Sequence, residues 1–384
     1  MTTSNRSGTL IKQTGTYSAF IPNPLPPVPP LDIDNEILTL LSKADRCLGR
    51  LDGITEILPN PDLFVAMYVK KEALLSSQIE GTQASFIDIL DVESHDAEKV
   101  KHLEEVVNYV QAMNYGLERL KERPLSLRLF REIHQLLLSG VRGSERSPGE
   151  FRKTQNWIGP AGCTLSTAAF VPPPPHDMIK AMGDLELFFH NDDDMPPLLK
   201  IGLIHAQFET IHPFLDGNGR MGRLLITFWL CQQQILSKPL LYLSYYFKIN
   251  KIEYYDRLMA VRLKGDWEGW TKFFLKGLAE VSMEATETAK KILKLKEDHS
   301  KLVNDNLRNP ANAIKLLESL FETPIVTINS VANILDVTYP TANTLVNEFY
   351  KLGILSFDTK TQRNRRYIYS HYVGLLQAGT ELTI

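Results

Sequence analysis

HPFLDGNGRMGR, residues 212–223, is the stretch of sequence that decides how this chain folds. Gly217 and Gly219 bracket Asn218, so the backbone can turn tightly and direct its N–H groups toward an anion at the start of a helix. The apolar residues 224–228 that follow indicate a buried helix, which we expect to begin near Arg220. This composition is typical of a nucleotide phosphate site.

The charged residues of the stretch have separate expected roles. Arg220 and Arg223 are three positions apart and share a helix face, where two guanidinium groups can grip phosphate oxygens, and Gly222 between them permits a close approach. Asp216 offers the single carboxylate that Mg²⁺ needs beside substrate phosphates. His212 is suited to act as a general base, since an imidazole titrates near neutrality.

The order of a histidine, an acidic residue, a Gly-Asn-Gly turn and two arginines resembles the signature of the Fic domain family. The resemblance implies an enzyme that transfers the AMP part of ATP to a hydroxyl side chain of a target protein. His212 would then be the base and Asp216 the Mg²⁺ ligand, and Phe214 would point inward and anchor the loop. The ATP phosphates would lie on Gly217, Asn218, Gly219, Arg220, Met221, Gly222 and Arg223. A homodimer is implied only by this resemblance.

A second string, Ser76-Ser77-Gln78-Ile79-Glu80-Gly81, ends an apolar-periodic segment that begins near Phe64. Gly81 is a plausible helix stop, and Ser76 and Glu80 share a helix face. Family members often carry an inhibitory helix with this pattern. The resemblance implies that Glu80 reaches Arg223 and occupies the guanidinium that should hold the γ-phosphate, so that ATP binds with its α-phosphate misaimed.

Two further segments are expected to border the site. Apolar residues around Ile158-Gly159 and around Phe170 flank Gly162, which predicts a small β-hairpin flap whose edge can hold an extended target segment. Asn250, Tyr254 and Tyr255 lie where the family walls the adenine, although tyrosines at helical spacing are also typical of a core. We expect His205 to be a satisfied core residue and leave it outside the site.

Composition fits a globular protein with a sizeable core, since 43% of the 384 residues are hydrophobic and 23% are charged. The net charge of -3 gives no bias of the whole chain toward nucleic acid or membrane. The N-terminus lacks an apolar signal core, and the longest apolar run, residues 224–231, is too short for a membrane span. Three cysteines without CxxC spacing argue against disulfides and structural zinc, so we expect a cytoplasmic protein that does not contact membranes.

The C-terminal sequence resembles a winged helix-turn-helix. Residues 330–335 and 340–346 predict two short helices, and residues 352–355 open a hairpin with a basic tip at Lys360, Arg363, Arg365 and Arg366. The second helix would present Thr341, Asn343, Thr344 and Asn347. Because this helix itself is poor in Lys and Arg, contact with DNA and contact with protein remain equally open.

We therefore predict an all-α fold: a Fic helical core with a small β-hairpin flap, followed by a C-terminal winged helix-turn-helix domain. The predicted parts are an N-terminal arm and helices over 1–110 with the inhibitory helix at about 64–81, a catalytic core over 111–280, a linker helix over 281–310 and the C-terminal domain over 311–384. The predicted function is protein adenylyltransferase autoinhibited by Glu80. Two alternatives stay open: removal of AMP with Glu80 as the base, and a DNA-binding regulator that senses nucleotide.

Overall fold

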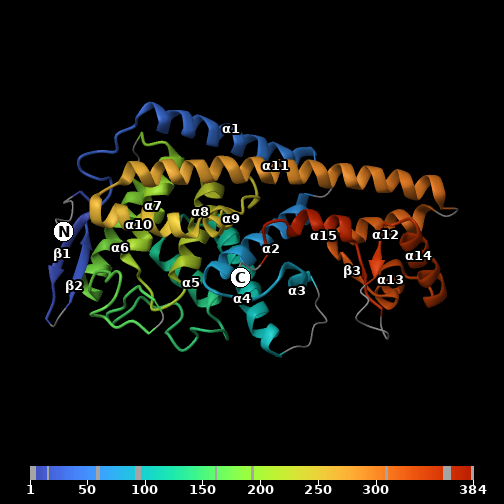
Figure 1. Ribbon diagram of the computed structural model, residues 1–384, viewed down its shortest axis with the longest axis horizontal. Helices are drawn as coiled ribbons and strands as arrows, with labels where there is room; N and C mark the ends of the chain where they lie inside the picture. The colour runs from blue at the N-terminus through green and yellow to red at the C-terminus, as the bar shows by residue number, and fades with distance from the viewer. Residues whose placement is uncertain are drawn as a thin grey trace.

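The computed structural model describes residues 6–14, 17–57, 61–90, 97–160, 162–191, 194–307, 310–357 and 365–381. It is mostly helical, as predicted, and elongated (Figure 1). Helix α11, Trp267–Asn306, extends along the molecule, and α1, Asn35–Ile57, lies against it. With 40 residues, α11 is about 60 Å long and connects the helical body to the C-terminal elements.

Two helices form the centre of the body. Helix α7, Pro197–Ile211, matches the predicted bounds and is buried at every position after Pro197. Helix α8, Asn218–Gln232, begins two residues earlier than expected and is also buried along most of its length. The helices around this pair are α2 Pro61–Ile79, α3 Phe86–Leu90, α4 Ala97–Leu120, α5 Leu127–Leu137, α6 Pro175–His190, α9 Ser244–Ile249 and α10 Lys251–Lys264. A helix that is apolar all round can be stable only inside such a shell.

Local capping explains several of the helix ends. The Ser126 hydroxyl accepts a hydrogen bond from the Leu129 N–H at the start of α5. Gly265, with φ of 66°, ends α10 in the left-handed conformation that glycine adopts without strain. Asp266 then accepts from the Gly269 N–H and starts α11 one residue later. The chain therefore turns sharply between two long helices that pack against each other.

Strand structure differs from the sequence prediction in two places. Residues predicted as part of a polar arm form an antiparallel hairpin, β1 Gly8–Lys12 with β2 Ser18–Pro22, in which Ala19 and Phe20 are fully buried. The predicted flap, by contrast, is a loop closed by one antiparallel bridge, Ile158 with Phe170. The intervening segment is rich in Gly, Ser and Thr and has few side chains that could stabilise longer strands.

The C-terminal elements follow α11 in the order α12 Pro310–Glu322, β3 Ile325–Val326, α13 Ile328–Leu335, α14 Tyr339–Lys351, β4 Ser356–Phe357, β5 Tyr367–Ile368 and α15 Ser370–Gln377. The three strands form an antiparallel sheet in the order β3-β5-β4. Lys360 and Arg363 lie outside the described residues. The predicted core-to-linker boundary at residue 280 falls inside the unbroken α11.

Helix α15 returns the chain from the C-terminal elements to the middle of the body, beside α2 (Figure 1). Within the described ranges, no helix has both the length and the apolar character that a bilayer span requires.

Candidate active site

The loop between α7 and α8 carries the site. His212, with φ of 51°, ends α7 in a left-handed conformation, and Gly217, with φ of 76°, precedes α8. The Asn218 side chain accepts from the Phe214 N–H and donates to the Phe214 carbonyl, both at 2.8 Å. Predicted as a phosphate ligand, this side chain thus closes the loop on itself. Phosphate contacts in this turn fall to the first N–H groups of α8, which have no helical carbonyl to bond.

His134 on α5 supports the loop and was not identified from the sequence. Its ring stacks on Phe214, with centroids 3.7 Å apart, and Phe214 is fully buried as expected for a loop anchor. The Gly149 N–H donates to Nδ1 at 2.9 Å, so Nε2 carries the hydrogen and donates to the Asp216 carbonyl at 2.9 Å. Burial lowers the pKa of His134 to about 4, which keeps the ring neutral.

Arg152 and Asn156 hold the loop from the other side, and sequence reasoning missed both. Arg152 Nε donates to the His212 carbonyl at 3.0 Å. Asn156 Nδ2 donates to the carbonyls of His212 and Phe214 at 3.2 and 2.9 Å. Only the short string Pro148-Gly149-Glu150-Phe151-Arg152 before the flap hinted at such a contact. These bonds fix the backbone on which the His212 imidazole is mounted.

His212 faces a cavity and is available as a base. Its Nδ1 is buried and has no hydrogen-bond partner among the described residues. Burial, with Arg262 and Arg152 adding to it, lowers the pKa of His212 to about 3. The imidazole is therefore neutral near pH 7, the form that can accept a proton.

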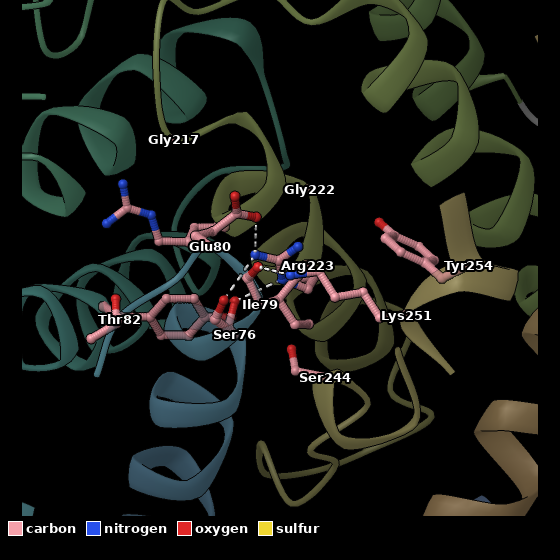
Figure 2. A network of polar contacts seen from close by, with 12 residues as sticks. Ser76, Ile79, Glu80, Thr82, Gly217, Gly222, Arg223, Ser244, Lys251 and Tyr254 are labelled. Carbon is pink, nitrogen blue, oxygen red and sulfur yellow. Dashed lines mark hydrogen bonds and ion pairs between the residues drawn. The ribbon is translucent and has the colours of Figure 1, made fainter. Parts of the chain in front are cut away.

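Arg223 is the centre of a second group of contacts (Figure 2). Its guanidinium donates to Glu80 Oε1 at 2.7 Å, to the Ser76 hydroxyl at 2.8 Å and to the Ser76 carbonyl at 3.0 Å. Glu80 follows directly after α2, and a Cβ on Gly219 would lie 2.3 Å from its Oε1. The carboxylate thus sits against the first turn of α8, where an anion would bind. Burial raises the pKa of Glu80, but Arg223 and Arg220 outweigh this effect and hold it below its ordinary value.

Arg220 lies behind this contact and is fully buried. None of its guanidinium nitrogens has a hydrogen-bond partner among the described residues. The nearest carboxylates are those of Asp216, at 3.6 Å, and Glu105, at 3.9 Å. A buried guanidinium without hydrogen bonds is costly, so this side chain is poised to bind an oxyanion.

Asp216 was tested as a Mg²⁺ ligand. Its Oδ1 accepts from the Gly217 N–H at 2.6 Å. A Cβ on Gly143 would lie 2.9 Å from Oδ2, so this glycine, with φ of 91°, leaves room beside the second oxygen. The described residues contain no cluster of three metal-ligating side chains. One carboxylate beside phosphates is nevertheless a donor set that suits Mg²⁺.

A cavity of 710 Å³ opens between the loop, the flap and α10. It brings together the predicted residues Glu80, His212, Gly219 and Arg223 from the motif and inhibitory segments, and Ile158, Gly159, Tyr254 and Tyr255 from the predicted borders. Its lining does not include Asp216, Asn218, Arg220, Met221, Gly222 or Asn250. Glu209 and Arg262, which the sequence did not single out, also line it.

The far wall of the cavity is built through His205. The Tyr254 hydroxyl and the Gly222 carbonyl each lie 2.9 Å from one His205 ring nitrogen. His205 is fully buried and its bonds are satisfied, as expected for a core residue. This bridge ties α8 to α10 and fixes Tyr254, whereas the Asn250 side chain is occupied with the Tyr246 carbonyl at 3.0 Å.

Comparison with known proteins gives matches over the same region. Residues 38–118 match the Fic/DOC family N-terminal model, and residues 124–230 match the Fic/DOC family model. A probable protein adenylyltransferase of Aquifex aeolicus is 28% identical over 180 residues, which are 45% of this chain and 51% of that protein. The protein adenylyltransferase Fic of Drosophila grimshawi is 30% identical over 134 residues, 34% of this chain and 26% of that protein. The chain thus spans about half of the first relative and a quarter of the second.

Solved structures agree on the fold. A Fic family protein from Desulfovibrio desulfuricans G20 superposes with a TM-score of 0.58 at 21% identity, covering 88% of this chain and 97% of that one. A Fic domain containing signaling protein from Bacteroides thetaiotaomicron gives a TM-score of 0.50 at 20% identity, covering 68% and 97%. At this level of identity the likeness concerns the arrangement of helices.

Proposed function

Because its matches over residues 38–118 and 124–230 place this chain in the Fic/DOC family, we propose that it is a protein adenylyltransferase held inactive by Glu80. One observation carries the proposal. A neutral His212 imidazole and the Arg223 guanidinium border one cavity large enough for a nucleotide, and Glu80 occupies the guanidinium.

In the proposed reaction, His212 takes the proton of a target hydroxyl as that oxygen bonds to the α-phosphorus of ATP. The bond from the α-phosphorus to the bridging oxygen breaks, and pyrophosphate leaves. The first N–H groups of α8 and the unsatisfied Arg220 guanidinium would stabilise the charge on the phosphates. Asp216 would hold Mg²⁺, which would neutralise phosphate charge when bound.

We propose that Glu80 controls the alignment of ATP. Its carboxylate lies on Arg223 and against Gly219, where a γ-phosphate would otherwise bind. ATP that enters beside Glu80 would have its phosphates displaced, so the α-phosphorus would not face the target hydroxyl. Ser76 holds Arg223 through two further bonds and would keep the guanidinium in place when Glu80 leaves.

Target binding is assigned to the flap. The bridge between Ile158 and Phe170 brings the loop over the cavity mouth, and Trp157 beside it is 42% exposed. An extended target segment could add to this edge through main-chain hydrogen bonds and present Ser, Thr or Tyr to His212.

The test is label transfer from α-³²P-ATP with Mg²⁺ to the protein itself and to a cell lysate. Wild type, Glu80→Gly and Glu80→Gly with His212→Ala should be compared. We expect strong label only in Glu80→Gly. Equal label in the His212→Ala form would refute the base, and label removed from a pre-adenylylated target by wild type would favour the reverse reaction.

For the C-terminal elements we propose a winged helix that binds DNA or protein. The order of helices and strands from α12 to β5 supports it, and Thr341, Thr344 and Asn347 are exposed on α14. Arg365 and Arg366 directly precede β5. Fluorescence anisotropy of a labelled duplex at two salt concentrations tests the DNA role, since phosphate contacts weaken steeply with salt. Absence of binding at low salt would leave the protein-docking role.

A further inference from the structure

Glu209 is a buried carboxylate whose position points to a ligand. It lies three residues before His212 on the last turn of α7 and lines the cavity. Its residue is 6% exposed, and Oε1 has no hydrogen-bond partner among the described residues. A buried acceptor that has lost water and gained no donor is unfavourable. A donor on a bound molecule would remove that cost.

The surroundings place this carboxylate at one part of the cavity. A Cβ on Gly222 would lie 2.5 Å from Glu209 Oε1, so glycine at this position admits the carboxylate against α8. Arg262 Nη2 donates to the Glu209 carbonyl at 2.9 Å and fixes the turn. The same cavity is bordered by Arg223 and by Tyr254. Burial raises the pKa of Glu209 to about 7, with Arg223 opposing the rise, so a positive charge alone does not satisfy the group.

We propose that Glu209 accepts a hydrogen bond from the nucleoside half of the bound nucleotide, either from a ribose hydroxyl or from an amino group of the base. This rests on the proposed function, in which Arg223 binds the phosphate end. Glu209 would then determine which nucleotide is bound, because a site built to bond a donor discriminates strongly against an analogue that lacks it.

Calorimetric binding tests the proposal in a Glu80→Gly, His212→Ala background, which removes the brake and prevents turnover. The ligands are ATP, 2′-deoxy-ATP, 3′-deoxy-ATP and purine riboside triphosphate, which lacks the 6-amino group. Glu209→Ala should weaken ATP by about 10- to 100-fold. One analogue should bind the background protein and the variant equally. Glu209→Gln keeps an acceptor and should lie between them.

The control is Glu253→Ala, since Glu253 lies on the exposed face of α10 and pairs with Arg257. It should leave all four affinities unchanged. An equal loss for all four nucleotides in Glu209→Ala, or no loss for any, would overturn the assignment. If the background protein itself does not bind ATP, the proposed nucleotide site fails before Glu209 is reached.

A separate set of contacts joins the C-terminal tail, residues 378–381, to the segment that carries Glu80. Gln78, two residues before Glu80, donates from Nε2 to the Thr380 carbonyl at 3.0 Å and to the Ala84 carbonyl at 2.9 Å. Lys248 on α9 donates to Gln78 Oε1 at 2.8 Å and to the Glu381 carbonyl at 2.5 Å. The last turn of α2 is thus bonded to the chain that leaves α15.

The tail is seated tightly at this point. Thr380 is 2% exposed, and Gly379 has φ of 82°. A Cβ on Gly379 would lie 2.3 Å from the Tyr245 ring, so a larger residue there must displace either the tail or the ring. Since α15 follows the C-terminal elements directly, a movement of those elements would pull on the tail.

We infer that the tail stabilises the position of Glu80 and that a ligand of the C-terminal elements could release it. This inference rests on the proposed inhibitory role. Gly379→Ala should raise transfer in the presence of Glu80 by about five-fold, the effect of one ordinary hydrogen bond. It should have no effect in a Glu80→Gly background, where the brake is absent.

The matched control is Gly374→Ala in α15, where a Cβ meets nothing within 4 Å. Hydrogen exchange of residues 76–82 should quicken in Gly379→Ala and stay unchanged in Gly374→Ala. Unchanged transfer in Gly379→Ala together with quicker exchange would overturn the inference, and so would unchanged exchange. If Glu80→Gly itself is no more active than wild type, the inhibitory role fails instead.

Discussion

Removal of Glu80 should change the affinity for ATP much more than the affinity for ADP. The perturbation is Glu80→Gly, made in a His212→Ala protein so that bound ATP is not consumed. The carboxylate lies 2.7 Å from Arg223 Nη2 and against Gly219. It therefore competes with a γ-phosphate and leaves α- and β-phosphate contacts on α8 largely free.

The size of the effect follows from that one contact. A hydrogen bond between charged groups is worth about 1.5–3 kcal/mol, or roughly 10- to 150-fold in a dissociation constant. The two bonds from Arg223 to Ser76 survive the substitution and keep the guanidinium oriented. We therefore expect the ratio of the ADP to the ATP dissociation constant to rise by roughly 10- to 150-fold, since only ATP gains the freed charged contact.

Isothermal titration calorimetry with Mg²⁺ measures both constants without knowledge of the target protein. Gln83→Gly, an exposed position in the same turn, is the control and should change neither constant. An equal change for ATP and ADP, or no change for either, would refute the competition. Because the pKa of Glu80 is held below its ordinary value, the carboxylate stays ionised from pH 6 to 8, and the wild-type ratio should be flat over that range.

Three other predictions concern the surrounding structure. Arg220→Met should abolish transfer in the Glu80→Gly form and yet leave the free energy of unfolding unchanged or higher, because it replaces a buried guanidinium that makes no hydrogen bond; a loss above about 2 kcal/mol in chemical denaturation would contradict this. Tyr254→Phe should cost about 1–2 kcal/mol by the same measurement, since it removes the partner of the buried His205 Nε2, and a neutral result would count against that bond. Stability should fall as the pH drops from 6.5 toward 4.5: three histidines with lowered pKa resist protonation only when folded, and two glutamates with a pKa of about 7 act in the opposite direction, so the net slope should be near that of one histidine, about 1.4 kcal/mol per pH unit. These groups are His134, His205, His212, Glu72 and Glu209. Stability that rises in this window would show that the glutamates dominate.

Much of the loop could be derived from residues 212–223 alone. Gly217 supplies a left-handed turn, and the apolar run after it forms a buried helix, because these properties depend on neighbouring residues. The bounds of α7 were predicted correctly for the same reason, since Pro197 marks its start and the motif marks its end. The role of the Asn218 side chain was not, because its partner is the backbone of Phe214 and not a ligand.

Other features depend on residues that are far apart in the sequence. His134 and Arg152 support the loop from other segments, and neither belongs to a pattern that marks it. The strands β1 and β2 pair because Phe20 is buried against Phe170, a contact that no local periodicity reveals. Packing also decides that α11 continues unbroken past residue 280, because its inner face lies against α1 and α12.

The sequence by itself determined which chemistry the chain carries: a base, a carboxylate, an anion-binding turn and two arginines within twelve residues. Only the tertiary structure decided how these groups are shared out. It pairs Arg223 with Glu80, leaves Arg220 unsatisfied and buries Glu209 beside the cavity. The physical reason is that backbone conformation is set by near neighbours, whereas burial and charge pairing are set by whatever the fold brings alongside.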